Sequence, residues 1–353
     1  MLTLLGMNLI EMTAEVQRAG FAAFRAKQLF HWLYQKGAAS FEEMANLPSD
    51  FRGWLRDHAR VGGVEAAETR AAPDGTMKIL WRLADGEHVE GVLMPEDERW
   101  TLCVSSQVGC PLGCRFCVTG SGGIRRDCAA NEIIGQVLRA RAILGGRGQT
   151  LTNLVFMGMG EPLLNLDAVI RALRLLISPQ ALKISSRRIT VSTAGIIEGI
   201  RRLSEARLNV KLAVSLNATD DGLRRKLMPI AKSNPLPELL EACRQFQTQS
   251  PNRHRVTFEY VLLDGVNDSL DHARALSRLV SAVPCKINLI PFNPDARLPY
   301  GRPPQARVEA FRDLLLEKSF TVAIRYSKGL EVSAACGQLA LRGRQDAAGG
   351  QNA

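Results

Sequence analysis

The sequence predicts an α/β protein whose core is a partial or full barrel of about six βα units. From residue 100 onward, apolar strand-like runs alternate with amphipathic helical patterns, which is typical of parallel strands joined by helical crossovers. The chain has 353 residues, which is enough for such a core plus an appendage. The predicted strands are residues 101–106, 151–157, 187–192, 210–216, 256–263, 285–290 and 320–326.

Two smaller regions precede the predicted barrel. Residues 1–61 carry apolar residues at helical spacing among basic residues, so they predict a small helical domain. Within residues 62–98, MKILWRL and HVEGVLM alternate apolar and polar residues around Asp85-Gly86, which predicts a hairpin in a short β-rich linker. The barrel core is then expected over residues 99–340, and residues 341–353 predict a disordered tail.

The composition is that of an ordinary globular protein, with 46% hydrophobic and 23% charged residues. No apolar run is long enough to span a bilayer, and the first residues lack the basic region and cleavage site of a secretory signal. We therefore expect a cytoplasmic protein with no membrane partner. The formal net charge of +10 fits ordinary basicity as well as a polyanionic partner such as nucleic acid.

Three of the eight cysteines form a tight cluster in the sequence GCPLGCRFC, with the spacing C-x3-C-x2-C. Disulfides are rare in a cytosolic chain of this size, so Cys110, Cys114 and Cys117 indicate metal or redox chemistry. A structural zinc site normally has four ligands in CxxC pairs, and the sequence offers no second pair. A four-iron cluster on three thiolates leaves one iron open to a small molecule, which is what catalysis needs.

Further distinctive residues follow the predicted strands, where the active sites of barrels lie. They are Gly158–Glu161, Ser192, Ser215–Asn217 and Asn293. The glycines of GMGEP would let the backbone approach a ligand closely, and Glu161 is able to accept hydrogen bonds from an ammonium group. Together with the three cysteines, these residues predict one site at one end of the barrel.

The cysteine spacing, with Phe116 just before the last cysteine, resembles the signature of the radical-SAM superfamily. The resemblance implies a partial (β/α)6 barrel, a [4Fe-4S] cluster on the three cysteines, and S-adenosylmethionine (SAM) bound to the open iron. An electron from the cluster then cleaves SAM and yields a 5′-deoxyadenosyl radical. By the same resemblance, the SAM pocket is lined by Gly160, Glu161, Ser192, Ser215, Leu216, Asn217 and Asn293.

Longer segments narrow the resemblance to the RlmN/Cfr family of radical-SAM RNA methyltransferases. They are CVSSQVGCPLGCRFC (103–117), EIIGQV (132–137), FMGMGEPLLN (156–165), CKINLIPFNP (285–294) and AACGQL (334–339). The resemblance implies methylation of C2 of adenosine in 23S ribosomal RNA and in transfer RNA, with residues 1–61 as an RNA-binding appendage. We further expect an electron donor such as flavodoxin and a monomeric enzyme.

Three more residues receive roles from this resemblance. Cys336 matches a cysteine that is methylated by a first SAM, while a second SAM on the cluster supplies the radical that activates this methyl group. Cys103 matches the thiol that resolves the resulting protein–RNA adduct through a transient disulfide with Cys336, and Glu90 matches the base that takes the C2 proton. The remaining cysteines are expected to pack as small buried hydrophobes: Cys128, Cys243 and Cys285.

Two alternatives remain open from the sequence. One is methylation of C8 of adenosine, as in the Cfr branch of the family. The other is a non-catalytic RNA-binding protein with a structural metal site, which leaves GMGEP, Cys103 and Cys336 without a role. The lead-in KGLEVSAACGQL (328–339) is less acidic than is usual in the family, and SLN (215–217) replaces an SLH.

Overall fold

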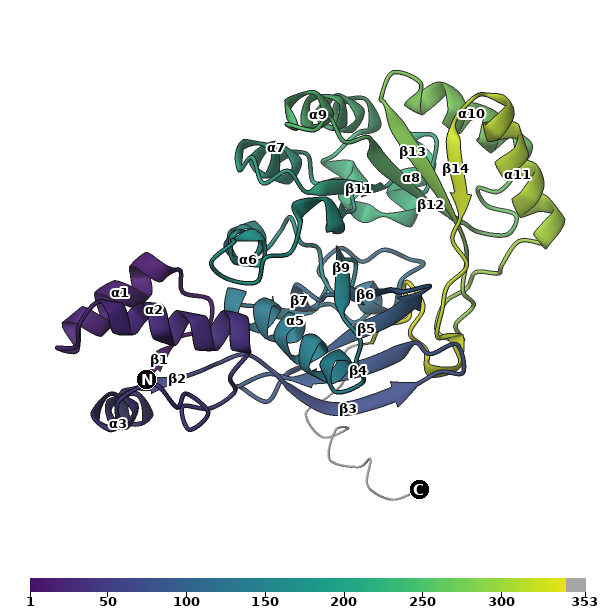
Figure 1. The fold of residues 1–353 in the computed structure, drawn as a ribbon. Helices are drawn as coiled ribbons and strands as arrows, with labels where there is room; N and C mark the ends of the chain where they lie inside the picture. Colours follow the sequence, from purple (N-terminus) through teal and green to yellow (C-terminus); the bar gives the residue numbers. More distant parts are fainter. Residues whose placement is uncertain (341–353) are drawn as a thin grey trace.

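A computed structural model describes residues 1–340 and confirms the predicted α/β core (Figure 1). Its main sheet has ten strands in the order β14-β13-β12-β11-β10-β9-β6-β5-β4-β3. The edge strands β14 and β3 do not pair with each other in the part of the chain described, so the sheet stays open, as expected of a partial barrel. The predicted disordered tail, residues 341–353, lies outside the described residues.

The parallel half of the sheet matches the predicted strands one for one. These strands are β6 (Arg99–Cys103), β9 (Leu151–Phe156), β10 (Ile189–Thr193), β11 (Lys211–Ser215), β12 (Val256–Leu262), β13 (Cys285–Pro291) and β14 (Thr321–Ile324). The helices that connect them are α5 (Ala130–Gly145), α6 (Leu166–Ile177), α7 (Ile197–Glu205), α8 (Asp221–Leu227), α9 (Leu236–Gln249), α10 (Leu270–Val280) and α11 (Gln305–Glu317). Because helices cover the sheet, strand residues such as Val191, Val214 and Phe258 are fully buried.

The region predicted as a β-rich linker continues the same sheet. Strands β3 (Glu65–Ala71), β4 (Met77–Arg82) and β5 (His88–Glu96) add antiparallel neighbours beyond β6. The predicted hairpin at Asp85-Gly86 joins β4 to β5, and Gly86 adopts the positive φ of 85° that such a turn favours. The linker therefore places Glu90 of β5 beside the barrel.

The N-terminal region contains the expected helices in a small unit beside α5 and α6 (Figure 1). Its elements are β1 (Leu2–Thr3), α1 (Leu9–Arg18), α2 (Phe24–His31), η1 (Trp32–Lys36), α3 (Ser49–His58) and β2 (Ala59–Arg60). The pairing of β1 with β2 was not predicted, because each strand has only two residues. Arg171 of α6 donates from Nε to the Gly6 carbonyl at 2.7 Å, which attaches this unit to the barrel.

The remaining elements are short. They are β7 (Gln107–Gly109), α4 (Val118–Ser121), β8 (Ile124–Asp127), η2 (Ser186–Arg188), η3 (Pro229–Lys232) and η4 (Leu330–Val332). Within residues 1–340, no helix is both long enough and apolar enough to cross a membrane.

Helix α5 touches the segment that leads from the N-terminal unit into the sheet. A Cβ added at Gly135 would lie 2.7 Å from Gly63 Cα and 2.8 Å from Val64 N, so only glycine permits this approach. Arg139, one turn further along the helix, donates from Nε to the Val64 carbonyl at 3.1 Å. The junction between the two parts of the chain therefore depends on backbone packing against α5.

Replacing Gly135 by Ala should lower the stability by about 1–3 kcal/mol, because the added methyl group overlaps backbone atoms that have no room to move aside. Gly145→Ala in the same helix is the matched control. Nothing lies within 4 Å of a Cβ at Gly145, and Ala is the better helix former by up to about 1 kcal/mol. Thermal denaturation compares the variants with the parent protein, and equal midpoints for both would contradict the close approach.

Candidate active site

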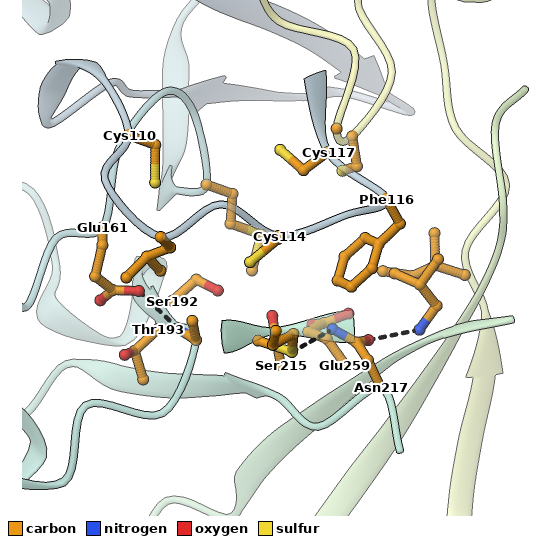
Figure 2. A pocket seen from close by; sticks show the side chains of 18 of the residues that line it. Cys110, Cys114, Phe116, Cys117, Glu161, Ser192, Thr193, Ser215, Asn217 and Glu259 are labelled. Atoms are coloured by element: carbon orange, nitrogen blue, oxygen red, sulfur yellow. Dashed lines mark hydrogen bonds between the residues drawn. The ribbon is translucent and has the colours of Figure 1, made fainter. Parts of the chain in front are cut away.

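A cavity opens at the carboxyl ends of the parallel strands, where the sequence predicted the site (Figure 2). Most of the predicted site residues line it: Cys110, Cys114, Cys117, Gly160, Glu161, Ser192, Ser215, Asn217, Asn293 and Cys336. Figure 2 shows the side chains of Cys110, Cys114 and Cys117 directed into this space, with Glu161 below them. Strands and loops far apart in the sequence thus contribute to one site.

The three cysteines lie on a loop whose backbone is held at both ends. The antiparallel pair β7 and β8 closes the base of the loop, and Cys110 N donates to the Gly123 carbonyl at 2.7 Å. Within the loop, Cys117 N donates to the Cys114 carbonyl at 3.2 Å, and Arg115 N reaches the Leu227 carbonyl of α8 at 2.9 Å. These bonds fix the directions of the thiols before any ligand binds.

The arrangement of the thiols fits an iron–sulfur cluster better than a single metal ion. Within residues 1–340, no group of three or more His, Cys, Asp or Glu side chains is arranged to hold one ion. Zinc ligands all lie about 2.0–2.3 Å from the same centre, whereas each thiolate of a four-iron cluster binds a different iron. Burial raises the pKa of Cys110 to about 12 and also raises that of Cys114, so bound cations are needed to keep these thiols ionised.

Glu161 is the buried carboxylate of the cavity. Its Oε1 accepts from Leu163 N at 3.0 Å and its Oε2 from Ala194 N at 2.7 Å, while the side chain remains on the cavity wall. Burial raises the pKa of Glu161 to about 7, against the opposing effect of these hydrogen bonds. The Thr193 side chain also hydrogen-bonds this carboxylate. A carboxylate has about four acceptor sites, so it can still accept a hydrogen bond from a cationic ligand.

The glycines before Glu161 line the cavity and also pack closely against another segment of the chain. A Cβ at Gly158 would lie 2.6 Å from Ser105 Oγ, and one at Gly160 would lie 2.5 Å from Gln107 Cβ. Gly160 also has a φ of +98°, a conformation that side chains rarely adopt. Packing against the segment that follows β6 therefore requires both glycines, and their approach to a ligand on the cavity side stays a prediction.

Two asparagines complete the cavity wall from loops after strands. Asn217 adopts a φ of 58°, and its Oδ1 accepts from Val261 N at 2.8 Å. Asn293 donates to Ser327 Oγ at 2.7 Å and accepts from Arg302 Nη2 at 2.9 Å. These bonds set the orientation of both side-chain amides. Sequence patterns could not specify that orientation.

The side chain of Leu216 lies elsewhere, although Ser215 and Asn217 line the cavity. Leu216 is fully buried in the hydrophobic core. Successive residues of an extended chain point to opposite faces, so its two neighbours face the cavity and Leu216 faces away. Only its backbone is near the site, where Leu216 N donates to the Glu259 carbonyl at 3.0 Å.

Cys103 and Cys336 lie near each other but in different environments. Cys103 is buried in β6, and both burial and the neighbouring Cys336 thiol raise its pKa. The Cys336 side chain is solvent-accessible within the cavity, yet the surrounding atoms raise its pKa to about 11. All eight cysteines of the chain, which fall within the described residues, are free thiols.

Glu90 lies in a separate polar pocket, which it shares with Arg70, Lys78 and Arg297. Its carboxylate forms an ion pair with Lys78 Nζ at 3.0 Å and accepts from Ala340 N at 2.9 Å. The chain segment 333–340 separates the two sites, because Cys336 and Gly337 line the cysteine cavity while Ser333, Gln338 and Ala340 line the pocket of Glu90. The structure therefore does not bring Glu90 onto the wall of the cysteine cavity.

Two charged residues of the site were missed from the sequence. Glu259 of β12 faces the cavity, accepts from Asn288 Nδ2 at 2.8 Å, and has a pKa raised by burial to about 7. A lone carboxylate in the apolar run VTFEYVLL was a signal that could have identified it. Arg224 of α8 lies behind the wall and gave no such signal, because the sequence DGLRRKL resembles an exposed basic helix.

Comparison with known proteins places this geometry in a family. Residues 104–276 match the Radical SAM superfamily, and residues 2–61 match the ribosomal RNA large subunit methyltransferase N-terminal domain. The chain is 47% identical to the dual-specificity RNA methyltransferase RlmN of Halorhodospira halophila, over 95% of this chain and 92% of that protein. Its identity to the RlmN of Geobacter sulfurreducens is also 47%, over 98% of this chain and 94% of the relative.

A solved structure agrees with these relatives. The crystal structure of a radical SAM methyltransferase from Sphaerobacter thermophilus matches with a TM-score of 0.93 and 42% identity, over 96% of this chain and 99% of that one. The alternative of a non-catalytic RNA-binding protein is therefore wrong, because the relatives are enzymes over nearly the whole length of the chain. The chain belongs to the RlmN family of radical-SAM RNA methyltransferases.

Proposed function

We propose that this enzyme methylates C2 of adenosine in 23S ribosomal RNA and in transfer RNA, with Cys336 as the methyl carrier. One observation carries the proposal: a fourth thiol, Cys336, lies on the wall of the cavity that the three clustered cysteines also line. Cys336 is also close enough to Cys103 to raise the pKa of the Cys103 thiol. A ring carbon without a lone pair is a poor acceptor in a simple displacement, so a carrier on the protein answers a chemical need.

The cofactor sites follow from the residues on the cavity wall. Cys110, Cys114 and Cys117 would hold a [4Fe-4S] cluster, and Glu161 would accept from the ammonium group of SAM. Gly160, Ser192, Ser215, Asn217 and Asn293 would line the rest of the SAM site, with Leu216 contributing backbone alone. When bound, the cluster and SAM supply a radical able to remove hydrogen from a methyl group. Two SAM molecules would be used per turnover, one as methyl donor and one as radical source.

The chain's own thiols would then handle the methyl group. Cys336 accepts the methyl from SAM, and its activated carbon forms a bond to C2 of the adenine. The adduct would first give up its unpaired electron to the oxidised cluster and its C2 proton to a base. Cys103 then attacks the sulfur of Cys336, so that an S–S bond forms as the bond between this sulfur and the transferred carbon breaks. The carbon keeps the electron pair of the broken bond and takes up a proton to become the methyl group. Their placement supports this step, since Cys336 lines the cavity and the buried Cys103 has Cys336 as its neighbour, although Cys103 itself does not line the cavity.

Glu90 would take the proton from C2. Its carboxylate is held by Lys78 and by Ala340 N, at the far side of the segment that carries Cys336. For Glu90 to meet the base that Cys336 attacks, the 333–340 segment has to shift away from the carboxylate. This requirement is consistent with a residue that acts only in the complex with RNA.

The partners are inferred from charge and from the N-terminal unit. The net charge of +10 and the match of residues 2–61 to a ribosomal RNA methyltransferase domain support RNA as the substrate. The relatives are named dual-specificity enzymes, which supports transfer RNA as a second substrate. We also propose a monomer that receives electrons from a protein such as flavodoxin.

The direct test is the identity of the modified nucleoside. Purified enzyme with SAM, a reductant and unmodified 23S ribosomal RNA or transfer RNA should yield 2-methyladenosine, measured by mass spectrometry of digested RNA against synthetic standards. Production of 8-methyladenosine would assign the enzyme to the Cfr type of reaction. Methylation of ribosomal RNA alone would remove transfer RNA from the proposal.

A second prediction concerns the cluster. The anaerobically reconstituted parent should hold about four irons per chain, because the three thiols are presented to one cavity. Replacing Cys110, Cys114 or Cys117 by Ala should remove the cluster and with it the cleavage of SAM. Cys243→Ala is the control, since this cysteine is fully buried in α9, and it should keep its iron. Zinc bound in place of iron by the reconstituted parent would contradict the assignment.

A third prediction separates the two special thiols. Cys336→Ala should still bind the cluster but transfer no methyl group, because it lacks the carrier. Cys103→Ala should attack the base and then fail to release it, so protein should accumulate covalently on RNA. A slowly migrating band that nuclease collapses measures this adduct on a denaturing gel, with Cys128→Ala as the control. Full turnover by Cys103→Ala, without trapped RNA, would rule out the carrier mechanism.

A further inference from the structure

Arg224 is a charged residue that the proposed chemistry does not use, although it is completely buried. It lies on α8, where its neighbours Arg225 and Lys226 are exposed and Arg224 alone turns inward. A buried guanidinium is costly unless its donors are satisfied. Among the described residues, it makes no ion pair within salt-bridge distance, so backbone carbonyls must offset this cost.

The guanidinium joins three separate backbone segments. Nη2 donates to the Ala194 carbonyl at 2.6 Å, Nη1 to the Asn234 carbonyl at 3.0 Å, and Nε to the Leu216 carbonyl at 3.3 Å. Ala194 follows β10, Leu216 follows β11, and Asn234 precedes α9. One side chain therefore cross-links the loops at the carboxyl ends of two neighbouring strands.

These loops form part of the wall of the cysteine cavity, and Thr193, Ser215 and Asn217 lie below Cys114 in Figure 2. Ala194 lines the cavity, and its amide is the donor to Glu161 Oε2 at 2.7 Å. Ser215 and Asn217, on either side of Leu216, also line it. A shift of the carbonyls bound by Arg224 would displace the groups that contact SAM.

The same helix also contacts the cysteine loop. The Leu227 carbonyl, at the end of α8, accepts from Arg115 N at 2.9 Å. Arg224 lies one turn before Leu227 on the same helix, and its guanidinium is completely buried. The helix therefore places a positive charge near the cysteine loop, in surroundings that screen it poorly.

We propose that Arg224 is a positioning residue of the cofactor site, which holds the SAM-binding loops together and places a fixed positive charge near the cysteine loop that would hold the cluster. Reduction adds negative charge to the cluster, so this cation stabilises the reduced state and raises the reduction potential. The proposal rests on the cluster and SAM of the family. It does not depend on the methyl-carrier steps or on the position methylated.

Lysine and methionine variants separate the two contributions. Lysine keeps the charge but lacks the planar set of donors that reaches three carbonyls, whereas methionine lacks both. Arg225→Lys and Arg225→Met are the matched controls, because Arg225 is the adjacent exposed residue of the same helix. All four variants are reconstituted with iron and sulfide and compared with the parent protein.

Two measurements without RNA give the outcome. Arg224→Lys should bind SAM about tenfold or more weakly, at a cluster midpoint potential close to that of the parent. Arg224→Met should weaken SAM binding as well and shift the midpoint to more negative values. SAM affinity is measured by equilibrium binding and the potential by a redox titration followed by electron paramagnetic resonance, and both Arg225 variants should match the parent.

The proposal is overturned if Arg224→Lys binds SAM as tightly as Arg225→Lys, or if Arg224→Met has the same midpoint potential as Arg225→Met. If Arg224→Met does not accumulate as folded protein, the SAM affinity of Arg224→Lys decides alone. Failure of the proposed RNA chemistry would leave both readouts unchanged, because neither requires methyl transfer.

Discussion

The site depends on the hydrogen bonds that hold the backbone at the two ends of the cysteine loop. The Nδ2 of Asn165 donates to the Ser106 carbonyl and to the Cys128 carbonyl, both at 2.7 Å. Ser106 precedes the loop and Cys128 follows it, so one buried amide clamps its two ends together. Asn165 occupies the N-cap position of α6, yet its side chain makes no capping bond. Its Nδ2 group instead holds the segment on which the three cysteines lie.

The fold was more predictable from the sequence than the contacts inside the site. Parallel strands buried on both faces produce apolar runs, so β9 to β13 were evident. Strand β3, with the sequence EAAETRA, was missed because it is an exposed edge strand with no apolar pattern. Residue spacing also correctly grouped the cysteines with Glu161, since the carboxyl ends of parallel strands meet at one edge.

What sequence patterns could not provide was the direction of individual side chains. The family resemblance assigned Leu216 and Glu90 to the site, but the alternation of the chain turns Leu216 into the core, and Glu90 lies behind the 333–340 segment. Arg224 was missed for the opposite reason, because burial of one arginine in a basic helix depends on carbonyls from three distant loops. Such contacts are set by tertiary packing and leave no local signature.

The electrostatics of the cavity point to ligands that bring positive charge. Burial raises the pKa of four groups, so ionisation of each is disfavoured in the protein alone: Cys110, Glu161, Glu259 and Cys336. A bound cation shifts the equilibrium from the protonated to the ionised form of these thiols and carboxyls, because it stabilises their negative charge and displaces the proton. Iron ions and the ammonium and sulfonium groups of SAM are ligands of this kind. The buried acids therefore favour uptake of these cofactors, whereas the Arg224 guanidinium is already bound by three backbone carbonyls.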